Sequence, residues 1–391
     1  MTSHLALQHL IDRVRAARAD GVVLNISGGN TKEFYGEAPV GEVLDVTPLA
    51  GITSYEPSEL VVTVRAGTLL AELEAVLAEK GQCLPFEPPR FAGVAAGGDI
   101  GGGTLGGTAG GTASGMTGGT VGGMVSTGLA GPSRAAVGSV RDHVLGACLL
   151  NGRAEVLAFG GTVMKNVAGY DVSRLLVGAM GTLGVILEVS IKVLPVAPAS
   201  ATLRFEMDEA TALKQLNQWG GLPLPINASA WWNGTLVLRL CGAAAALQSA
   251  VAKLGGELVE PELAAGFWAG LRDQSDEFFV GAAQALASGA RLWRLAVPQT
   301  APALQLSGEQ LVEWGGAQRW VVTSAAPAVL REAAARVGGH ATVFRAVDRA
   351  AAPAVSAFTP LSAPLARIHR EMKKSFDPDG IFNRGRLYPD L

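Results

Sequence analysis

The sequence predicts an α+β fold divided into two domains, and three observations support this prediction. The chain has 391 residues, more than one ordinary hydrophobic core accommodates. Short apolar runs alternate with segments of helical periodicity through the first half of the chain. The composition changes near Pro198, because all seven tryptophans follow that residue. We therefore expect a first domain over residues 1–197 and a smaller α+β domain over residues 198–391.

The first elements follow from apolar periodicity. Residues 1–20 place apolar and charged side chains at helical spacing, which predicts an N-terminal helix. Apolar and β-branched runs predict strands at residues 21–26, 42–47 and 59–65. Thr68 is expected to cap a helix that ends at Gly81. Glu87-Pro88-Pro89 then fixes an extended exit, so a first subdomain is expected over about residues 1–88.

A second subdomain is expected over about residues 89–197. Two strands, 144–150 and 154–159, flank Asn151-Gly152, a dipeptide typical of type I′ hairpin turns. Residues 165–195 begin with a helical pattern that breaks at Gly178. They continue through the turn Gly181–Gly184 into a strand rich in β-branched residues.

Residues 198–391 predict strands at 235–241 and 291–297 and an alanine-rich helix around 325–337. The tail, residues 365–391, begins as a helix that Asp377-Pro378 and a turn at Gly380 stop. The tryptophans of this half are expected mainly in its core, with an interface as the alternative.

Composition excludes several classes of function. A net charge of −3 gives no reason to expect nucleic acid or an anionic membrane surface as a partner. The N-terminus lacks the apolar core of a signal peptide. The longest uncharged stretch, residues 100–133, is mostly Gly, Thr and Ala and is too polar for a transmembrane segment. We therefore expect a cytoplasmic protein, and association with a membrane through partners stays open.

Cysteine and histidine patterns give no sign of a metal site. Cys83, Cys148 and Cys241 are widely separated and form no C-x-x-C, which argues against an iron–sulfur cluster or a structural zinc in this chain. The five histidines show no spacing typical of paired ligands. Each cysteine is expected to be a small buried residue, and no metal is predicted.

A glycine loop follows the first strand. Ser27-Gly28-Gly29-Asn30-Thr31 has the composition of a loop whose backbone amides approach a phosphate closely. By itself the same segment is also compatible with an ordinary turn. Gly101-x-Gly103-x-x-Gly106 formally matches a dinucleotide fingerprint, but no strand precedes it and no amphipathic helix follows it. We interpret that second match as chance, since it lies inside a Gly-Gly-Thr repeat.

The segment KNVAGYDVSRLLVGAMGTLGVILEVSIKVLP, residues 165–195, resembles the flavin-binding segment of the vanillyl-alcohol-oxidase/PCMH family of FAD proteins. Within that family it is most similar to the FAD-binding subunits of bacterial glycolate oxidase. The resemblance implies a PCMH-type FAD-binding domain of two subdomains, followed by a cap domain whose C-terminal segment returns toward the flavin. Relative to the family, about residues 92–118 look like a glycine-rich insertion, which leaves the register of the second loop open.

The resemblance also implies the cofactor and its binding residues. Relatives with covalent flavin carry a histidine where this chain has Asn30, so noncovalent FAD is expected. The Thr120-Val-Gly-Gly123 copy of the repeat is the one that continues as the family's second loop does. The implied contacts with FAD are Ser27, Gly28, Gly29, Asn30, Thr31, Thr120, Gly122, Gly123, Gly128, Tyr170, Asp171, Gly181, Thr182, Gly184, Val185 and Asn383.

For function, the resemblance implies the FAD-binding subunit of a glycolate oxidase complex, which oxidises glycolate to glyoxylate and passes electrons to an iron–sulfur subunit. The histidine-rich metal motif of the catalytic relatives is missing from this sequence. A sister flavoprotein subunit is therefore expected to supply it, and no catalytic residue is assigned here. Two alternatives stay open: a stand-alone FAD-linked 2-hydroxy-acid dehydrogenase, and a structural partner whose flavin has no redox duty. The substrate, the catalytic base and the oligomeric state cannot be read from the sequence.

Overall fold

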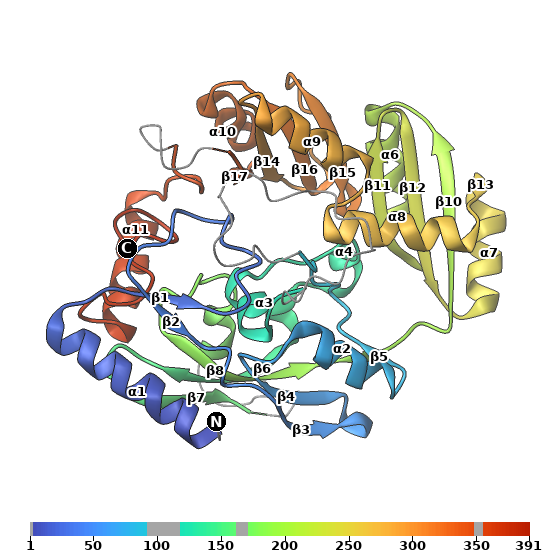
Figure 1. The fold of residues 1–391 in the computed structure, drawn as a ribbon. Coiled ribbons are helices and arrows are strands. Elements are labelled where there is room, and N and C mark those ends of the chain that lie inside the picture. The colour runs from blue at the N-terminus through green and yellow to red at the C-terminus, as the bar shows by residue number, and fades with distance from the viewer. Residues whose placement is uncertain (1–2, 92–117, 162–170, 348–354) are drawn as a thin grey trace.

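A computed structural model describes residues 3–91, 118–161, 171–347 and 355–391. Figure 1 shows two layered bodies, which we name the lower body (residues 3–195) and the upper body (residues 199–347). The last described helix lies beside the lower body, although it follows the upper body in the chain. Both bodies combine helices with sheets, so the predicted α+β class is confirmed. None of the helices in the described ranges is both long and apolar enough to cross a membrane.

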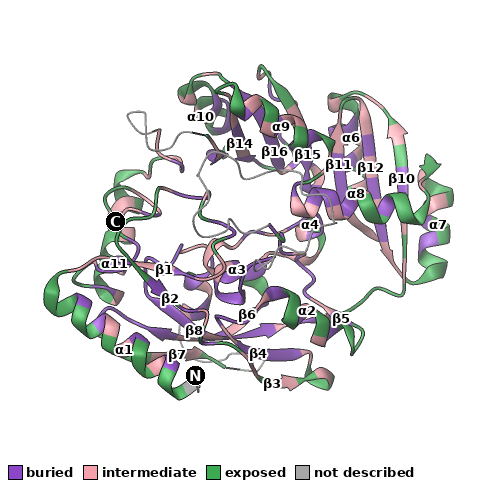
Figure 2. Cartoon of the chain, in the orientation of Figure 1, coloured by how far each residue is buried: buried purple, intermediate pink, exposed green. Residues whose placement is uncertain are grey.

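The lower body is built on a five-stranded antiparallel sheet. Its strand order is β3 (Ile52–Glu56), β4 (Val61–Arg65), β8 (Val185–Lys192), β6 (Val144–Leu150) and β7 (Val156–Gly160). The first two strands come from the expected first subdomain and the other three from the second, so the two share one sheet. The predicted strand from Val185 is confirmed as β8, and it lies at the centre of the sheet with both faces buried (Figure 2).

Helices cover both faces of this sheet. On one face, α2 (Leu70–Ala78) and α3 (Val121–Thr127) pack with Phe86 and the apolar side of β8. On the other, α1 (Ser3–Asp20) packs on the parallel pair β1 (Leu24–Ser27) and β2 (Glu42–Asp45). Smaller elements complete the body: η1 (Pro57–Glu59), β5 (Gln82–Cys83), α4 (Arg134–Val137), α5 (Val140–His143), η2 (Val172–Leu176) and β9 (Leu194–Pro195).

Two local predictions were wrong. Thr68 does not cap α2, because its hydroxyl accepts a hydrogen bond from Gly51 N at 2.9 Å and Leu69 occupies the N-cap position. The predicted hairpin β6–β7 exists, but its turn is longer than two residues, since Leu150 pairs with Val156. The Asn151 side chain holds this longer turn by accepting hydrogen bonds from two backbone amides within it.

The upper body is an eight-stranded antiparallel sheet. Its order is β13 (Glu257–Leu258), β10 (Ala199–Glu206), β12 (Thr235–Gly242), β11 (Ile226–Trp232), β15 (Glu309–Glu313), β16 (Gln318–Thr323), β14 (Arg291–Ala296) and β17 (His340–Arg345). The short turn η3 (Trp314–Gly316) joins β15 to β16. Helices α6 (Glu209–Gly220), α7 (Ala244–Leu254) and α10 (Pro327–Arg336) pack on one face. Helices α8 (Pro261–Asp273) and α9 (Glu277–Ala287) pack on the other.

Most tryptophans of the upper body belong to its core. Trp268, Trp293, Trp314 and Trp320 are buried, and the other three are half-buried. Trp314 also reaches the lower body, because its Nε1 donates to Gly131 O at 3.0 Å. One apolar cluster joins the two bodies and combines Tyr35 and Met180 with Phe344. The core expectation therefore holds for most of these residues, and one of them serves an interface as well.

The C-terminal tail returns to the lower body. Helix α11 (Ala363–Phe376) packs Met372 and Phe376 against the lower core. Lys373 is buried and donates to Thr182 O, Asp377 Oδ2 and Phe382 O, each at 2.7 Å. The residues after α11 then run beside β1, where Phe382 forms an isolated parallel β-bridge with Leu24.

Candidate functional site

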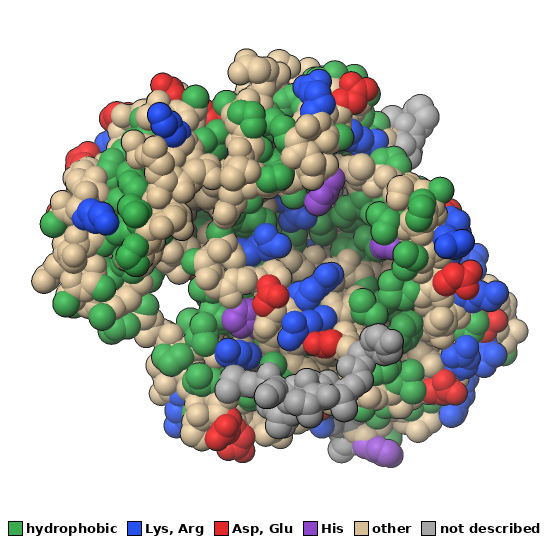
Figure 3. Space-filling model, turned by 180° about the vertical axis from the view of Figure 1, so that it is seen from behind, with side chains coloured by type: hydrophobic (Ala, Val, Ile, Leu, Met, Phe, Trp, Pro, Cys, Tyr) green, Lys and Arg blue, Asp and Glu red, His purple; other side chains and the backbone are tan. Residues whose placement is uncertain are grey.

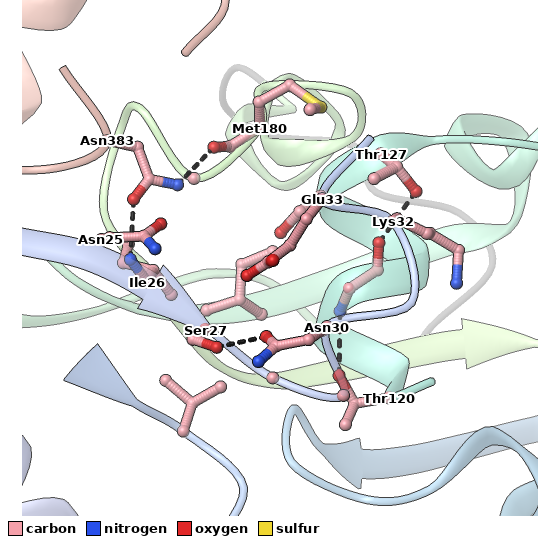
Figure 4. A pocket seen from close by; sticks show the side chains of 18 of the residues that line it. Asn25, Ile26, Ser27, Asn30, Lys32, Glu33, Thr120, Thr127, Met180 and Asn383 are labelled. Atoms are coloured by element: carbon pink, nitrogen blue, oxygen red, sulfur yellow. Dashed lines mark hydrogen bonds between the residues drawn. The ribbon is translucent and has the colours of Figure 1, made fainter. Parts of the chain in front are cut away.

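A cleft opens in the lower body where four segments meet (Figure 4). These segments are the loop after β1, the helix α3, the turn at residues 180–184 and the tail after α11. The cleft contains about 790 Å³ of empty space, including the part that opens to solvent. A space-filling view from behind shows a hollow between the two bodies, with charged side chains gathered at its floor (Figure 3).

Glycines allow the first two of these segments to interlock. A Cβ at Gly29 would lie 2.9 Å from Gly119 Cα, and a Cβ at Gly28 would lie 2.6 Å from Thr120 Oγ1. In return, a Cβ at Gly119 would lie 2.6 Å from Thr31 Oγ1. The loop after β1 and the entry to α3 therefore approach closely only because both carry glycine at the contact.

The loop after β1 presents backbone donors to the cleft. Within the described ranges, no residue accepts a hydrogen bond from the amides of Gly28, Gly29, Asn30 or Thr31. Asn30 has a φ of 52°, and its side chain accepts a hydrogen bond from Ser27 Oγ, which fixes the turn. Consecutive amides without an internal acceptor, in a loop with a positive φ, form a concavity suited to an anion such as a phosphate.

The first three backbone N–H groups of α3 already have acceptors within the protein. Val121 N donates to Thr68 O at 2.9 Å, and Gly122 N donates to Ala66 O at 2.8 Å. Gly123 N donates to the Thr120 hydroxyl at 3.3 Å. The first two bonds hold the start of α3 against the segment after β4, and the third caps the helix.

Asn383 ties the opposite wall together. Its Oδ1 accepts from Ile26 N at 2.7 Å, and its Nδ2 donates to Met180 O at 2.6 Å. Gly181, with a φ of 72°, lies against this amide, since a Cβ there would come within 2.6 Å of Asn383 Nδ2. The tail residue therefore joins β1 to the turn at residues 180–184.

Two cationic residues line the cleft that the sequence analysis did not assign to it. Lys32 is buried, and that burial lowers the pKa of its ammonium to about 8. Arg386 is also buried, and its Nη2 donates to Glu33 O at 2.9 Å. Lys32 directly follows the glycine loop in the sequence, and this adjacency is the signal that would have identified it.

The structure brings most of the predicted binding residues together. Those that line the cleft are Ser27, Gly28, Gly29, Asn30, Thr31, Thr120, Gly122, Gly123, Gly181, Gly184 and Asn383. Four others lie outside its lining. Gly128 ends α3, Asp171 pairs with Arg174 at 2.7 Å, Thr182 donates to Ala179 O, and Val185 belongs to the core. Tyr170 and nearly all of the expected insertion at residues 92–118 lie outside the described residues. For every predicted binding residue, whether or not it lines the cleft, contact with FAD stays a prediction.

Cleft residues missing from the prediction are mostly neighbours of the predicted ones. They are Asn25, Ile26, Lys32, Glu33, Pro39, Val46, Ala66, Ser126, Thr127, Met180, Ile186 and Arg386. Ser126 and Thr127 follow the second loop by one turn of α3, so helical spacing would have indicated them. Val46 and Ala66 directly follow the strands β2 and β4. Their spacing in the sequence gave no sign that they line the cleft.

The remaining titratable groups do not form a metal site in the part of the chain that the structure describes. The three cysteines are each half-buried, and burial raises the pKa of each thiol. A second, small cavity lies between the bodies, where Leu129 and Gly131 face β15 and β16. Glu313 lines it, and burial raises the pKa of its carboxyl to about 7.

Comparison with known proteins gives a family match and several similar proteins. Residues 6–119 match the family described as FAD binding domain. Over 384 residues the chain is 42% identical to glycolate oxidase subunit GlcE of Escherichia coli (strain K12), and the alignment covers 98% of each protein. It is 27% identical over 190 residues to a D-lactate dehydrogenase of Anaerostipes hadrus, covering 48% of this chain and 34% of that protein.

Two further similarities are more limited. Glycolate oxidase subunit GlcD of Bacillus subtilis (strain 168) is 28% identical over 178 residues, which is 45% of this chain and 33% of that protein. A solved structure of alkyldihydroxyacetonephosphate synthase superposes with a TM-score of 0.62 at 13% identity, covering 96% of this chain and 74% of that one. At that identity the superposition supports the fold alone.

Proposed function

This chain belongs to the family of the glycolate oxidase subunit GlcE, and we propose that it acts as the FAD-binding subunit of a glycolate oxidase complex. In that role it takes part in the oxidation of glycolate, a 2-hydroxy acid, to glyoxylate. The single observation that carries the cofactor assignment is the loop at Gly28–Thr31. Its amides lack acceptors within the described protein and face a cleft whose walls are closed by glycine contacts.

The residues of the cleft fit FAD. The amides of Gly28 to Thr31 would hold its diphosphate. Gly122 and Gly181 also line the cleft, and their lack of a side chain allows the close approach of Ala66 and Asn383. Bound FAD supplies the capacity to accept a hydride and to pass electrons on, while the protein positions it. Asn383 holds β1 and the turn at residues 180–184 at a fixed separation, which preserves the shape of the cleft.

We further propose that the cofactor is held noncovalently, because Asn30 occupies the place of the histidine that carries the flavin in covalent relatives. Its side chain bonds to Ser27 within the loop. The partner subunits form the rest of the proposal. A sister flavoprotein would supply the base and the metal that hold and deprotonate a 2-hydroxy acid, and an iron–sulfur subunit would receive the electrons.

One experiment tests cofactor and partners together. The purified chain is expected to be yellow, and acid precipitation is expected to release all of its flavin into the supernatant. Glycolate alone should leave the flavin absorbance unchanged, and glycolate-dependent dye reduction should appear only after co-expression with the two partner subunits. Turnover by the single chain at the rate of the complex would contradict the subunit role and favour a stand-alone dehydrogenase.

A glycine variant tests the position of the cofactor. Gly29→Ala places a Cβ against the backbone of Gly119, which cannot move away as a side-chain tip would. We expect this variant to lose most of its flavin. Gly220→Ala is the matched control, because a Cβ at that position in α6 meets nothing within 4 Å. Full flavin content in Gly29→Ala would remove the loop from the site.

A further inference from the structure

Lys32 lies at the junction of the two glycine segments that form the cleft. Its Nζ is 3.2 Å from Thr31 Oγ1, on the loop after β1. A Cβ at Gly119, on the segment that leads into α3, would lie 3.1 Å from the same Nζ. The side chain is thus fixed between both segments, and Figure 4 shows it beside the loop that carries Asn30.

The ammonium of Lys32 is buried with few partners. Only 7% of the residue is exposed, and Thr31 Oγ1 is the one hydrogen-bond partner of Nζ among the described residues. No carboxylate of the described chain forms an ion pair with it, and the nearby ring of Phe91, at 5.7 Å, supplies only a weak cation–π contact. An ammonium has three donors, so two remain for a group outside the described protein.

Burial of such a cation is unfavourable unless a charged or polar partner compensates for lost hydration. Gly28 to Thr31 line the same cleft, and their amides also have no acceptor among the described residues. Both sets of donors call for an acceptor rich in negatively charged oxygens. A diphosphate meets this requirement better than a single carboxylate, because its oxygens can reach the amides and the ammonium at once.

We propose that Lys32 is a specificity-determining residue of the cleft, whose ammonium recognises the diphosphate of FAD together with the amides of Gly28–Thr31. The inference deepens the proposed function and rests on FAD occupying this cleft. It assigns to Lys32 a role in choosing FAD over flavins that lack the diphosphate. A structural role within the lower core is the rival reading, and a contact with the isoalloxazine ring is another.

The test uses flavin-free protein and four ligands. FAD carries both ring system and diphosphate, FMN a single phosphate, riboflavin only the ring system, and ADP the diphosphate without the flavin. Lys32→Met keeps the unbranched apolar stem, one atom shorter, and removes the charge, whereas Lys32→Arg keeps the charge. Lys214→Met is the control, since Lys214 is an exposed lysine on α6 in the upper body.

For Lys32→Met, we expect the Kd of FAD to rise about 10- to 100-fold, the range for loss of a charge-assisted hydrogen bond. Displacement of FAD by ADP should weaken by a similar factor, while the Kd of riboflavin should change less than about threefold. The flavin-free variant should melt at the same temperature as the parent or higher, because the uncompensated cation is gone. Lys32→Arg should recover most of the affinity for FAD, and Lys214→Met should match the parent throughout.

Three outcomes would overturn the inference. Unchanged FAD affinity in Lys32→Met would remove the contact, and an equal loss for riboflavin would move it to the ring system. A lower melting temperature of the flavin-free variant, with uniform weakening of all four ligands, would make Lys32 structural. If Lys32→Met does not fold, the same comparison is made with Lys32→Gln and Lys32→Arg, and identical profiles of those two would also refute a role for the charge. Failure of the proposed function is distinct, because the parent protein itself would then bind no FAD.

Discussion

At the scale of single residues, the site depends on side chains that hold backbone segments in place. Asn383 is the clearest case, because it combines a φ of 40° with hydrogen bonds to two separate segments. The backbone N–H of Asn383 also donates a hydrogen bond to Leu24 O at 2.9 Å. An asparagine adopts this backbone conformation more readily than most residues and supplies a donor and an acceptor at once. Loss of the side chain would leave the partly buried amide of Ile26 and the buried carbonyl of Met180 without this partner.

Asn383→Ala is therefore expected to destabilise the protein by about 1–3 kcal/mol, because one buried and one partly buried backbone group lose their partners. The flavin content should fall in parallel. Asn233→Ala is the matched control, since Asn233 has a φ of 47° in an exposed turn between β11 and β12. Both variants carry the same backbone strain, so their difference in urea-unfolding free energy isolates the tertiary contacts. Equal losses in the two variants would contradict the bridging role.

At the scale of elements, β15 carries a buried carboxyl on the face of the upper sheet that meets α8 and α9. Glu313 Oε2 accepts from Gln318 Nε2 at 2.9 Å and from Trp320 Nε1 at 2.6 Å. Both donors favour the ionised form and so lower the pKa of this carboxyl, but the loss of hydration on burial has the larger effect. Burial accordingly raises the pKa of Glu313 from 4.5 to about 7.

The sign of the resulting pH dependence follows from this shift. The folded pKa is raised, so the contribution to stability is fully present below pH 4.5 and is lost as the pH rises to about 7. For Glu313→Gln this loss should be absent. The unfolding free energy of the parent relative to this variant should fall by about 3 kcal/mol between pH 4.5 and pH 7 and then level off.

Two features make this measurement specific. Asp276, whose pKa burial raises to about 6, titrates in both proteins and largely cancels in the difference. Glu332→Gln changes an exposed glutamate on α10 and should give a flat difference over the same range. A flat difference for Glu313→Gln as well would show that Glu313 is ionised in the folded protein.

Elements with a strong local signal were predictable from the sequence. The strand β8 combines β-branched residues with a preceding glycine turn, and the loop at Ser27–Thr31 follows a short apolar strand. The pairing of β4 with β8 was not predictable, because it joins residues more than a hundred positions apart. Thr68 illustrates a different limit. Its hydroxyl accepts a hydrogen bond from the amide of Gly51, which lies in another loop, and does not cap the helix that follows it.

In the candidate site, the sequence predicted best the positions where glycine allows two segments to approach closely. Gly28, Gly29, Gly181 and Gly184 all line the cleft, because only glycine permits the close approaches found there. The sequence shows that Lys32 follows the glycine loop, but it does not show that Lys32 is buried. A lysine after a turn is usually exposed, and this burial depends on Gly119, which approaches from elsewhere in the chain.

At the scale of the whole molecule, polar bridges and one apolar cluster hold the upper body over the lower. Arg294 Nη2 donates to Tyr35 OH at 2.7 Å, and Arg239 pairs with Glu87 at 2.7 Å. Glu87 also accepts from Ser133 N at 2.9 Å, just before α4. The guanidinium of Arg239 lies over the ring of Trp268, 4.9 Å from its centroid, which shields the pair from water. These contacts fix the upper body beside the cleft without closing it.

A double-mutant cycle measures what this bridge contributes. Glu87→Gln keeps an acceptor for Ser133 and removes the charge, and Arg239→Met removes the guanidinium. We expect a coupling free energy of about 1–3 kcal/mol, because both side chains are largely shielded from solvent. The pair Arg13–Glu42, at 3.0 Å and much more exposed, is the matched control and should couple by no more than about 0.5 kcal/mol. A coupling equal to that of the exposed pair would assign the attachment of the upper body to the apolar cluster around Phe344 instead.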